Sequence, residues 1–297
     1  MRKEQYIRFG ALVSWRVAEP APATPRDLYP RLDAQTIARY RQAQPYPHGV
    51  FDDFLDPASA RRMAAEFPPV NPEAWINYTH VNERKFGKND RSTFPPSLGA
   101  AVDEFNAPPF IAWLERLTGI NGLKPDPSLE GGGLHQTQRG GHLNIHADFT
   151  GHPHHPTWRR RVNVILYLNE GWREEWGGAL ELWSRDMRAC EQKIAPLFNR
   201  VAIFNTDTDS FHGLPEPLGC PEGTTRKSLA LYYFTDEQQP FLVRSTEYRA
   251  RPGDGAKGIA IWADKLVLRV YDKVKRRFNL DDRFASRVLG LFSRKKS

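Results

Sequence analysis

The feature that most constrains the fold is a series of short apolar runs between Gly131 and Phe234. The runs are rich in Val, Leu, Ile, Tyr and Phe and are separated by clusters of Gly, Pro, Asn and Asp; they read "GLHQTQ", "HLNIHAD", "RVNVILYLN", "GALELW", "NRVAIFN" and "SLALYYF". Short runs of this composition between turn residues predict β-strands. Their number and spacing indicate an antiparallel sandwich or jelly roll. We therefore expect a mainly β domain.

The chain ahead of this region, residues 32–119, predicts mostly helices that flank the β region. Asp56-Pro57 is typical of a helix start. Two sets of apolar residues follow helical spacing: Ala60, Met63, Ala64 and Phe67, and then Phe110, Trp113, Leu114 and Leu117. Between them, residues 77–96 ("NYTHVNERKFGKNDRSTFPP") are polar and follow neither helical nor strand periodicity. That segment is predicted to be a loop, either a plain solvated one or a functional lid or recognition loop.

Composition divides the chain into three parts. Residues 1–30 contain the proline-rich stretch "EPAPATPRDLYP" and predict an arm. Residues 31–245 are expected to form one domain with its β core at 131–240, and residues 246–297 a basic helical extension. The first residues resemble neither a secretory signal nor a membrane span, which favours a cytoplasmic protein. Cys190 and Cys220 are expected to be reduced.

The positive charge belongs to the extension. Residues 257–297 hold 12 Lys and Arg against four Asp, whereas the rest holds 30 against 31 acidic residues, so we expect no nucleic-acid partner. An apolar stripe runs along the extension: Ile259, Trp262, Leu266, Val270, Val274 and Phe278. Such an amphipathic helix either packs on the domain or contacts an anionic membrane surface or an acidic partner.

Three residues are candidate metal ligands. His146 and Asp148 in "NIHAD" are two positions apart, which puts both side chains on one face of a strand. His212 follows the run "NRVAIFN", where a closed two-sheet fold could bring it back over the first pair. Two imidazoles and one carboxylate on one face leave positions open, as in non-haem Fe(II) oxygenases. The histidines of "HPHHP" lie among prolines in a loop and are not expected to be ligands.

Arg226 is a candidate anion-binding residue. It begins the strand run "TRKSLALYYF", in which alternation places Arg226 and Ser228 on one face and Lys227 on the other. A buried arginine is costly unless it meets an anion, and its planar fork matches a carboxylate.

The order of these motifs resembles the Fe(II)/2-oxoglutarate-dependent dioxygenases of the prolyl 4-hydroxylase-like branch. The resemblance is strong from His135 to Phe234 and extends back to "PYPHGVFDDFL". It implies a double-stranded β-helix (jelly roll) core with supporting N-terminal helices. It also implies that His146, Asp148 and His212 are the iron ligands. For the distal carboxylate of 2-oxoglutarate it implies a set of contacts: Arg226, with Lys227 as the alternative that collagen-type members suggest, Tyr167, Ser228 and Gln136.

The resemblance also implies the reaction. Fe(II), 2-oxoglutarate and O2 are the expected cofactors, with ascorbate as an additional candidate, and an unactivated C–H of the substrate becomes hydroxylated with release of succinate and CO2. The substrate is a prolyl residue of a peptide, a small molecule or a glycan-linked group; a non-catalytic jelly-roll binding protein is the alternative from another class. Candidate substrate contacts are His135, His142, Asn163, His80 and Asn82, where His142 shares the face of His146 if its strand is unbroken.

Overall fold

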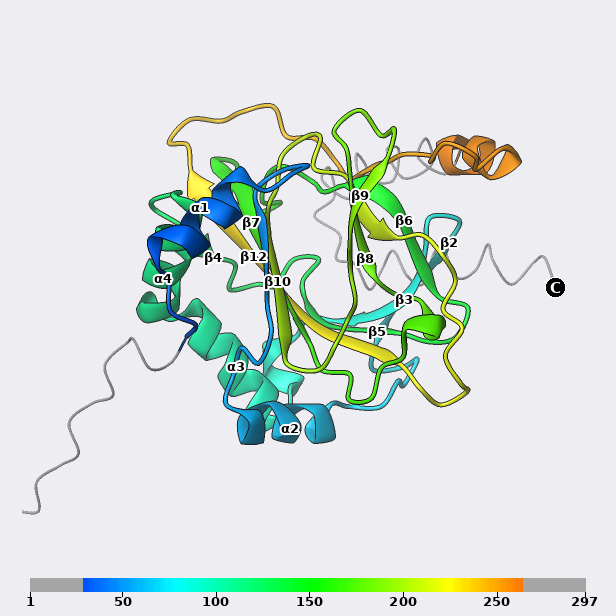
Figure 1. Ribbon diagram of the computed structural model, residues 1–297, viewed down its shortest axis with the longest axis horizontal. Coiled ribbons are helices and arrows are strands. Elements are labelled where there is room, and N and C mark those ends of the chain that lie inside the picture. The colour runs from blue at the N-terminus through cyan, green and yellow to red at the C-terminus, as the bar shows by residue number, and fades with distance from the viewer. Residues whose placement is uncertain (1–28, 264–297) are drawn as a thin grey trace, which may run out of the picture.

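A sheet of antiparallel strands forms the body of the computed structural model, which describes residues 29–263 (Figure 1). Within that range the sheet has 13 strands. Their bounds are β1 His48–Phe51, β2 Ile76–His80, β3 Glu83–Lys88, β4 Lys124–Pro125, β5 Gly133–Thr137, β6 His142–Ala147, β7 Trp158–Tyr167, β8 Leu180–Trp183, β9 Cys190–Ile194, β10 Arg200–Asn205, β11 His212–Leu214, β12 Arg226–Asp236 and β13 Glu247–Tyr248.

The sheet folds back on itself. Its main path of hydrogen-bonded neighbours runs β1-β10-β7-β12-β5-β3-β6-β11-β8-β9, while β2, β4 and β13 pair at its sides. Figure 1 shows β7, β10 and β12 on one side, β6, β8 and β9 on the other, and β3 and β5 between them. This is the jelly-roll core that the sequence predicted, since strands far apart in the chain become neighbours around a common interior.

The long strands β7 and β12 are largely buried on both faces because each face is covered. In β7, the side chains of Val162, Val164 and Leu166 pack in the main hydrophobic core beneath the helices. The alternate residues Asn163 and Ile165 point to the interior of the folded sheet. Period-two alternation therefore separates a helix-covered face from an interior face along one strand.

Four helices cover the outer face of the β7–β10–β12 side (Figure 1). They span Ala34–Gln42 (α1), Pro57–Glu66 (α2), Pro96–Asn106 (α3) and Pro108–Thr118 (α4), with short 3-10 turns at Arg91–Thr93 and Glu174–Trp176. The helix start predicted at Asp56-Pro57 is confirmed, because the Asp56 carboxylate accepts from the Ser59 amide at 2.9 Å. The second helix is confirmed as α4, which ends at Gly119 with a φ of 78°.

The prediction of a loop at residues 77–96 was wrong for residues 77–88. Its first half is the hairpin of β2 and β3, in which Ile76 pairs with Gly87 and His80 with Glu83. The hairpin shows no hydrophobic alternation because one of its faces lines a polar cavity, so that Tyr78, Glu83 and Lys85 occupy the inward positions. The sequence also did not reveal β1, β4, β9, β11 and β13, which are short or largely exposed.

The structure covers only part of the expected termini. Residues 1–28 and 264–297, which include most of the arm and of the amphipathic extension, lie outside the described residues. A helix begins at Ala256, where Ile259 is 72% exposed and Trp262 is 66% exposed. Among residues 29–263, none of the helices has the length and apolar character needed to cross a bilayer. Cys190 and Cys220 are both free thiols, as expected.

Candidate metal and cosubstrate site

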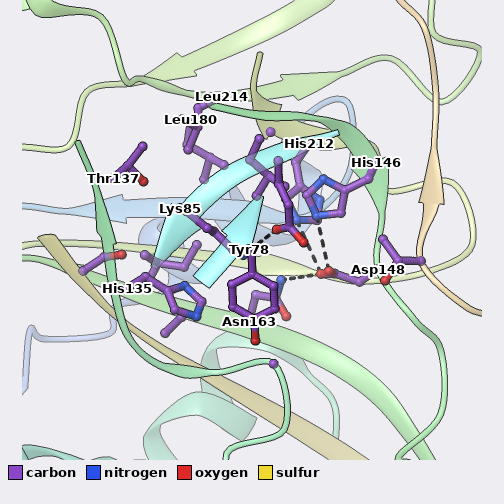
Figure 2. A pocket seen from close by; sticks show the side chains of 18 of the residues that line it. Tyr78, Lys85, His135, Thr137, His146, Asp148, Asn163, Leu180, His212 and Leu214 are labelled. Carbon is purple, nitrogen blue, oxygen red and sulfur yellow. Dashed lines mark hydrogen bonds and ion pairs between the residues drawn. The ribbon is translucent and has the colours of Figure 1, made fainter. Parts of the chain in front are cut away.

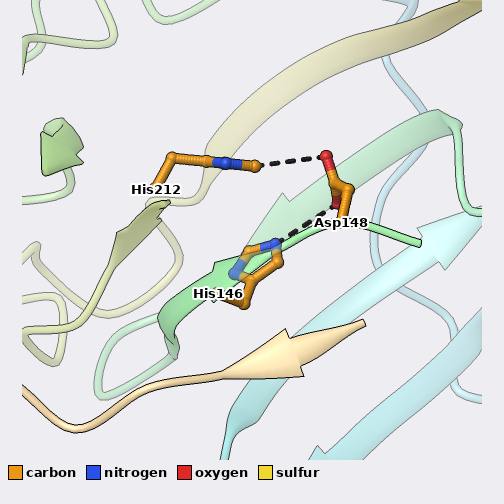
Figure 3. A group of neighbouring side chains, drawn as sticks. All are labelled: His146, Asp148 and His212. Carbon is orange, nitrogen blue, oxygen red and sulfur yellow. Dashed lines mark ion pairs between the residues drawn. The ribbon is translucent and has the colours of Figure 1, made fainter. Parts of the chain in front are cut away.

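His146, Asp148 and His212 come together as one group of neighbouring side chains (Figure 3). His146 lies on β6 directly opposite His212 at the start of β11, and Asp148 follows the end of β6. The Nε2 atom of His146 is 3.5 Å from Oδ1 of Asp148, and Nε2 of His212 is 3.4 Å from Oδ2. One ligand atom from each residue lies within 4.8 Å of the others, so the three could hold a single metal ion.

The hydrogen bonds of the two imidazoles fix which nitrogen faces Asp148. Nδ1 of His146 is 2.9 Å from the Asn144 carbonyl oxygen, and Nδ1 of His212 is 2.9 Å from that of Ser210. A carbonyl accepts, so each Nδ1 carries the proton and each Nε2 presents a lone pair. Burial lowers the pKa of His212 to about 4, which keeps its ring neutral. Two lone pairs and a carboxylate thus converge as acceptors on one point, an arrangement that fits a divalent cation.

Asp148 is held by two neighbouring side chains. The Asn163 amide donates to Oδ2 at 2.8 Å, and the Arg160 guanidinium lies 2.9 Å from the same oxygen. Arg160 also donates two hydrogen bonds to the Asn163 oxygen, at 3.0 and 2.9 Å. Burial raises the pKa of Asp148, but the charge of the Arg160 guanidinium outweighs it and holds the pKa well below its usual range. The carboxylate is therefore ionised and fixed in orientation.

A cavity of about 200 Å³ extends from these three residues into the sheet (Figure 2). Its walls come from β2, β3, β5, β6, β7, β8, β11 and β12. Thr246 and Tyr248 close one side; they belong to residues 237–255, which we call the C-terminal strap. The Tyr248 ring lies 5.5 Å from the His146 ring, centroid to centroid, and is buried.

Arg226 lies in this cavity, 5% exposed, at the start of β12. Its Nε donates to the Gly178 carbonyl at 2.8 Å and its Nη2 donates to the Tyr167 hydroxyl at 3.3 Å. Ser228, two residues along, lines the same cavity. Lys227 points away, with Nζ 5.9 Å from the Phe67 ring centroid. The alternation inferred for this strand is thus observed, and Lys227 is not positioned to replace Arg226.

Gln136 does not face the cavity, contrary to our expectation. Its amide donates to the Pro68 carbonyl and accepts from the Thr225 hydroxyl, both at 2.7 Å. Neighbouring residues of a strand face opposite sides, so it is His135 that lines the cavity. Burial, with the positive charge of Lys85, lowers the pKa of His135 to about 3. A neutral imidazole, rather than an amide, therefore stands on this wall.

His142 does not share the face of His146, because β6 contains a bulge. His212 pairs with His146 and Leu214 pairs with Leu143, so β6 advances by three residues where β11 advances by two. The extra residue reverses the alternation, and Leu143 lines the cavity. The Nε2 atom of His142 instead lies 3.2 Å from the Val81 carbonyl oxygen.

The remaining three candidates for substrate contact have other roles. Asn82 is fully buried, and its side-chain oxygen accepts from Asn144 at 3.2 Å. His80 lies behind the cavity wall with Nε2 3.0 Å from Oε1 of Glu83. Asn163 does line the cavity, but both ends of its amide are used by Arg160 and Asp148. We therefore assign Asn163 to the support of Asp148.

Arg160 was not singled out from the sequence, although its side chain is 1% exposed and touches a candidate ligand. Its guanidinium carbon lies 3.5 Å from the Tyr232 ring centroid and 4.5 Å from that of Phe149. In the pairing of β7 with β12, Tyr233 lies opposite Val162, but the next residue, Phe234, lies opposite Arg160, so that Arg161 is skipped. Strict alternation from Asn163 would have selected Arg161, so the sequence carried no usable signal for Arg160.

Comparison with known proteins agrees with this geometry. Residues 132–234 match the sequence model of the 2OG-Fe(II) oxygenase superfamily. The mouse protein prolyl 3-hydroxylase OGFOD1 is 29% identical over 147 residues, which are 48% of this chain and 24% of that protein. The chain thus spans about a quarter of the length of this curated relative.

Two solved structures are also similar. A prolyl-4-hydroxylase from Pseudomonas putida aligns with a TM-score of 0.45 and 18% identity, over 68% of this chain and 99% of that one. A prolyl hydroxylase from Trichoplax adhaerens, in complex with a hypoxia inducible factor peptide fragment, aligns with a TM-score of 0.47 and 17% identity, over 68% and 88%.

Proposed function

We propose that the chain is an iron(II)- and 2-oxoglutarate-dependent hydroxylase, because residues 132–234 match the model of the 2OG-Fe(II) oxygenase superfamily. The proposal is supported by two features that lie in the same cavity. Three metal-type ligands converge at one end, and a buried arginine whose polar contacts are uncharged lies in the same cavity. A dianion that chelates a metal and ends in a carboxylate would satisfy both features.

Each side chain then has a defined task. His146, His212 and Asp148 would hold iron, and Arg160 and Asn163 keep Asp148 ionised and oriented. Arg226, Tyr167 and Ser228 would bind the distal carboxylate of 2-oxoglutarate. When bound, iron and 2-oxoglutarate supply the oxidising chemistry, in which O2 is consumed, succinate and CO2 are released and a substrate C–H becomes C–OH. The side chains of His146, His212 and Arg226 are buried, which limits their contact with bulk water.

We propose a prolyl group as the substrate to test first. The mouse relative is a prolyl 3-hydroxylase, and its aligned segment covers 48% of this chain. The scaffold alone does not select a substrate, because the loops and edge strands around such a cavity do so.

The proposed cofactors can be tested without a substrate. Metal-stripped protein is titrated anaerobically with Fe(II) and then 2-oxoglutarate, and the weak visible charge-transfer band of the chelate is recorded. We expect the band in the wild type, and a much higher 2-oxoglutarate requirement in Arg226→Ala. Lys227→Ala, on the opposite face of β12, is the matched control and should behave as wild type. A folded wild-type protein with no band would refute the hydroxylase function and favour a binding protein.

A further inference from the structure

The cavity contains a second charged pair that neither the metal nor 2-oxoglutarate uses. Glu83 and Lys85, two residues apart on β3, both line the cavity, with Nζ of Lys85 3.2 Å from Oε2 of Glu83. Their side chains are only 11% and 16% exposed. The other oxygen of Glu83 lies 3.0 Å from Nε2 of His80, and the Lys85 ammonium lies 5.2 Å from the Tyr78 ring centroid. Because this ion pair is buried and contacts His80 and Tyr78, it is an ordered part of the cavity wall.

The charge of the cavity is not balanced. Its lining holds the cations Lys85, Arg160 and Arg226 and the carboxylates Glu83 and Asp148. A divalent metal and dianionic 2-oxoglutarate cancel each other, so the loaded cavity keeps one positive charge. Buried charge without a partner is costly, and a ligand with one negative charge would remove that cost.

Lys85 is the cation best placed to meet that ligand. Arg160 is committed to Asp148 and Asn163, and Arg226 to the distal carboxylate. An ammonium has three donors, so the contact with Glu83 does not exhaust its capacity. Figure 2 shows Lys85 projecting into the same cavity as His135 and the three metal-type ligands.

We propose that Lys85, held by Glu83 and Tyr78, is an anion subsite for the substrate, and that the substrate carries one carboxylate close to the carbon that is hydroxylated. This inference rests on the proposed function. For a prolyl substrate it selects a proline with a free carboxylate over one inside a peptide, where that group is an uncharged amide.

Two probes that differ only in this charge test the proposal: N-acetyl-L-proline and N-acetyl-L-prolinamide. Each is titrated into protein saturated with Mn(II) and 2-oxoglutarate, and the paramagnetic broadening of the probe's NMR signals reports binding near the metal. In the wild type we expect the acid to bind at least tenfold more tightly than the amide. Glu83→Gln should increase this preference, because it removes the competing carboxylate, and Lys85→Met should abolish it.

A double variant, Glu83→Gln with Lys85→Met, guards against misfolding, since it removes both charges of the pair together. It should bind 2-oxoglutarate as the wild type does and show no preference for the acid. The proposal is overturned by equal or absent binding of both probes to the wild type, or by a preference that survives in the double variant. A 2-oxoglutarate affinity lowered as in Arg226→Ala would also overturn it, because Lys85 would then serve the cosubstrate. Failure of the proposed function would show earlier, as wild-type protein that binds neither Mn(II) nor 2-oxoglutarate before any probe is added.

Discussion

Replacement of Arg226 by methionine should stabilise the free protein while it removes cosubstrate binding. In the described structure the polar contacts of this guanidinium are the Gly178 carbonyl and the Tyr167 hydroxyl, both uncharged, and burial lowers its pKa. The cation therefore lowers the stability of the free protein, and it should stabilise the complex with 2-oxoglutarate.

The expected magnitude follows from the site. Replacing a buried ion pair by apolar side chains of similar volume is neutral or stabilising by about 1–4 kcal/mol, and a buried charge without a counter-ion, such as that of Arg226, is at least as costly to the fold. Loss of the hydrogen bond to Gly178 costs about 1 kcal/mol. We expect a net gain of about 1–2 kcal/mol, which for a domain of this size is a rise in Tm of about 2–8 °C.

Thermal unfolding with and without 2-oxoglutarate measures both effects. In the wild type loaded with Mn(II), 2-oxoglutarate at a hundred times its Kd should stabilise the fold by about 2.7 kcal/mol. Arg226→Met should start from a higher Tm without ligand and respond little to 2-oxoglutarate. Lys227→Met, on the other face of β12, should retain the response. A lower Tm for Arg226→Met with an intact ligand response would refute the reasoning, because the guanidinium would then be a structural tie.

Four further outcomes are expected. Asp148→Ala should lose Mn(II) binding, measured by electron paramagnetic resonance, while its circular dichroism stays that of the wild type; retained binding would remove Asp148 from the ligand set. Asn163→Ala should weaken Mn(II) binding about 10- to 100-fold, because one of the two donors that orient Asp148 is lost; an unchanged Kd would contradict this. Gln136→Ala should leave the 2-oxoglutarate Kd within about twofold, in contrast to Arg226→Ala, since its amide faces Pro68. The pKa of His135 is lowered to about 3 in the folded protein, so the unfolded chain binds a proton first as the pH falls below about 6.5, the ordinary pKa of histidine. The free energy of unfolding should therefore decrease between roughly pH 6.5 and pH 3. In chemical denaturation over this range, the slope of that free energy against pH should be shallower in His135→Phe by up to about 1.4 kcal/mol per pH unit.

The fold was predictable wherever both faces of a strand or one face of a helix are apolar. The runs that became β7, β10 and β12 are recognisable because helices cover one side and the interior covers the other. The hairpin at residues 76–88 was missed because its inward residues serve a polar cavity. In this hairpin the sequence lacks the hydrophobic alternation of a strand because its inward residues line the cavity, and such a departure is expected near a functional site.

The candidate site was predictable to the extent that its strands are regular. Spacing of two placed His146 with Asp148 and Arg226 with Ser228, and the structure brings these four to one cavity. One-residue irregularities in β6 and β7 reversed the alternation elsewhere, which misplaced His142 and concealed Arg160. In β6 and β7 the cavity face carries polar residues, so the reversed alternation could be located only once the strand partners were known.

The C-terminal strap has a consequence for the kinetics of the site. In the described structure, the backbone hydrogen bonds of the two-residue strand β13 and the bond from Arg249 N–H to the Ile145 carbonyl at 2.8 Å tie this part of the strap to β6. Segments held by so few hydrogen bonds open locally at far lower free energy than the sheet unfolds. Opening would uncover His146 on the Tyr248 side while β6 and β11 stay paired. Amide hydrogen exchange at Glu247 and Arg249 should therefore be fast relative to β7, and that opening rate sets a ceiling on how quickly molecules enter and leave through this wall.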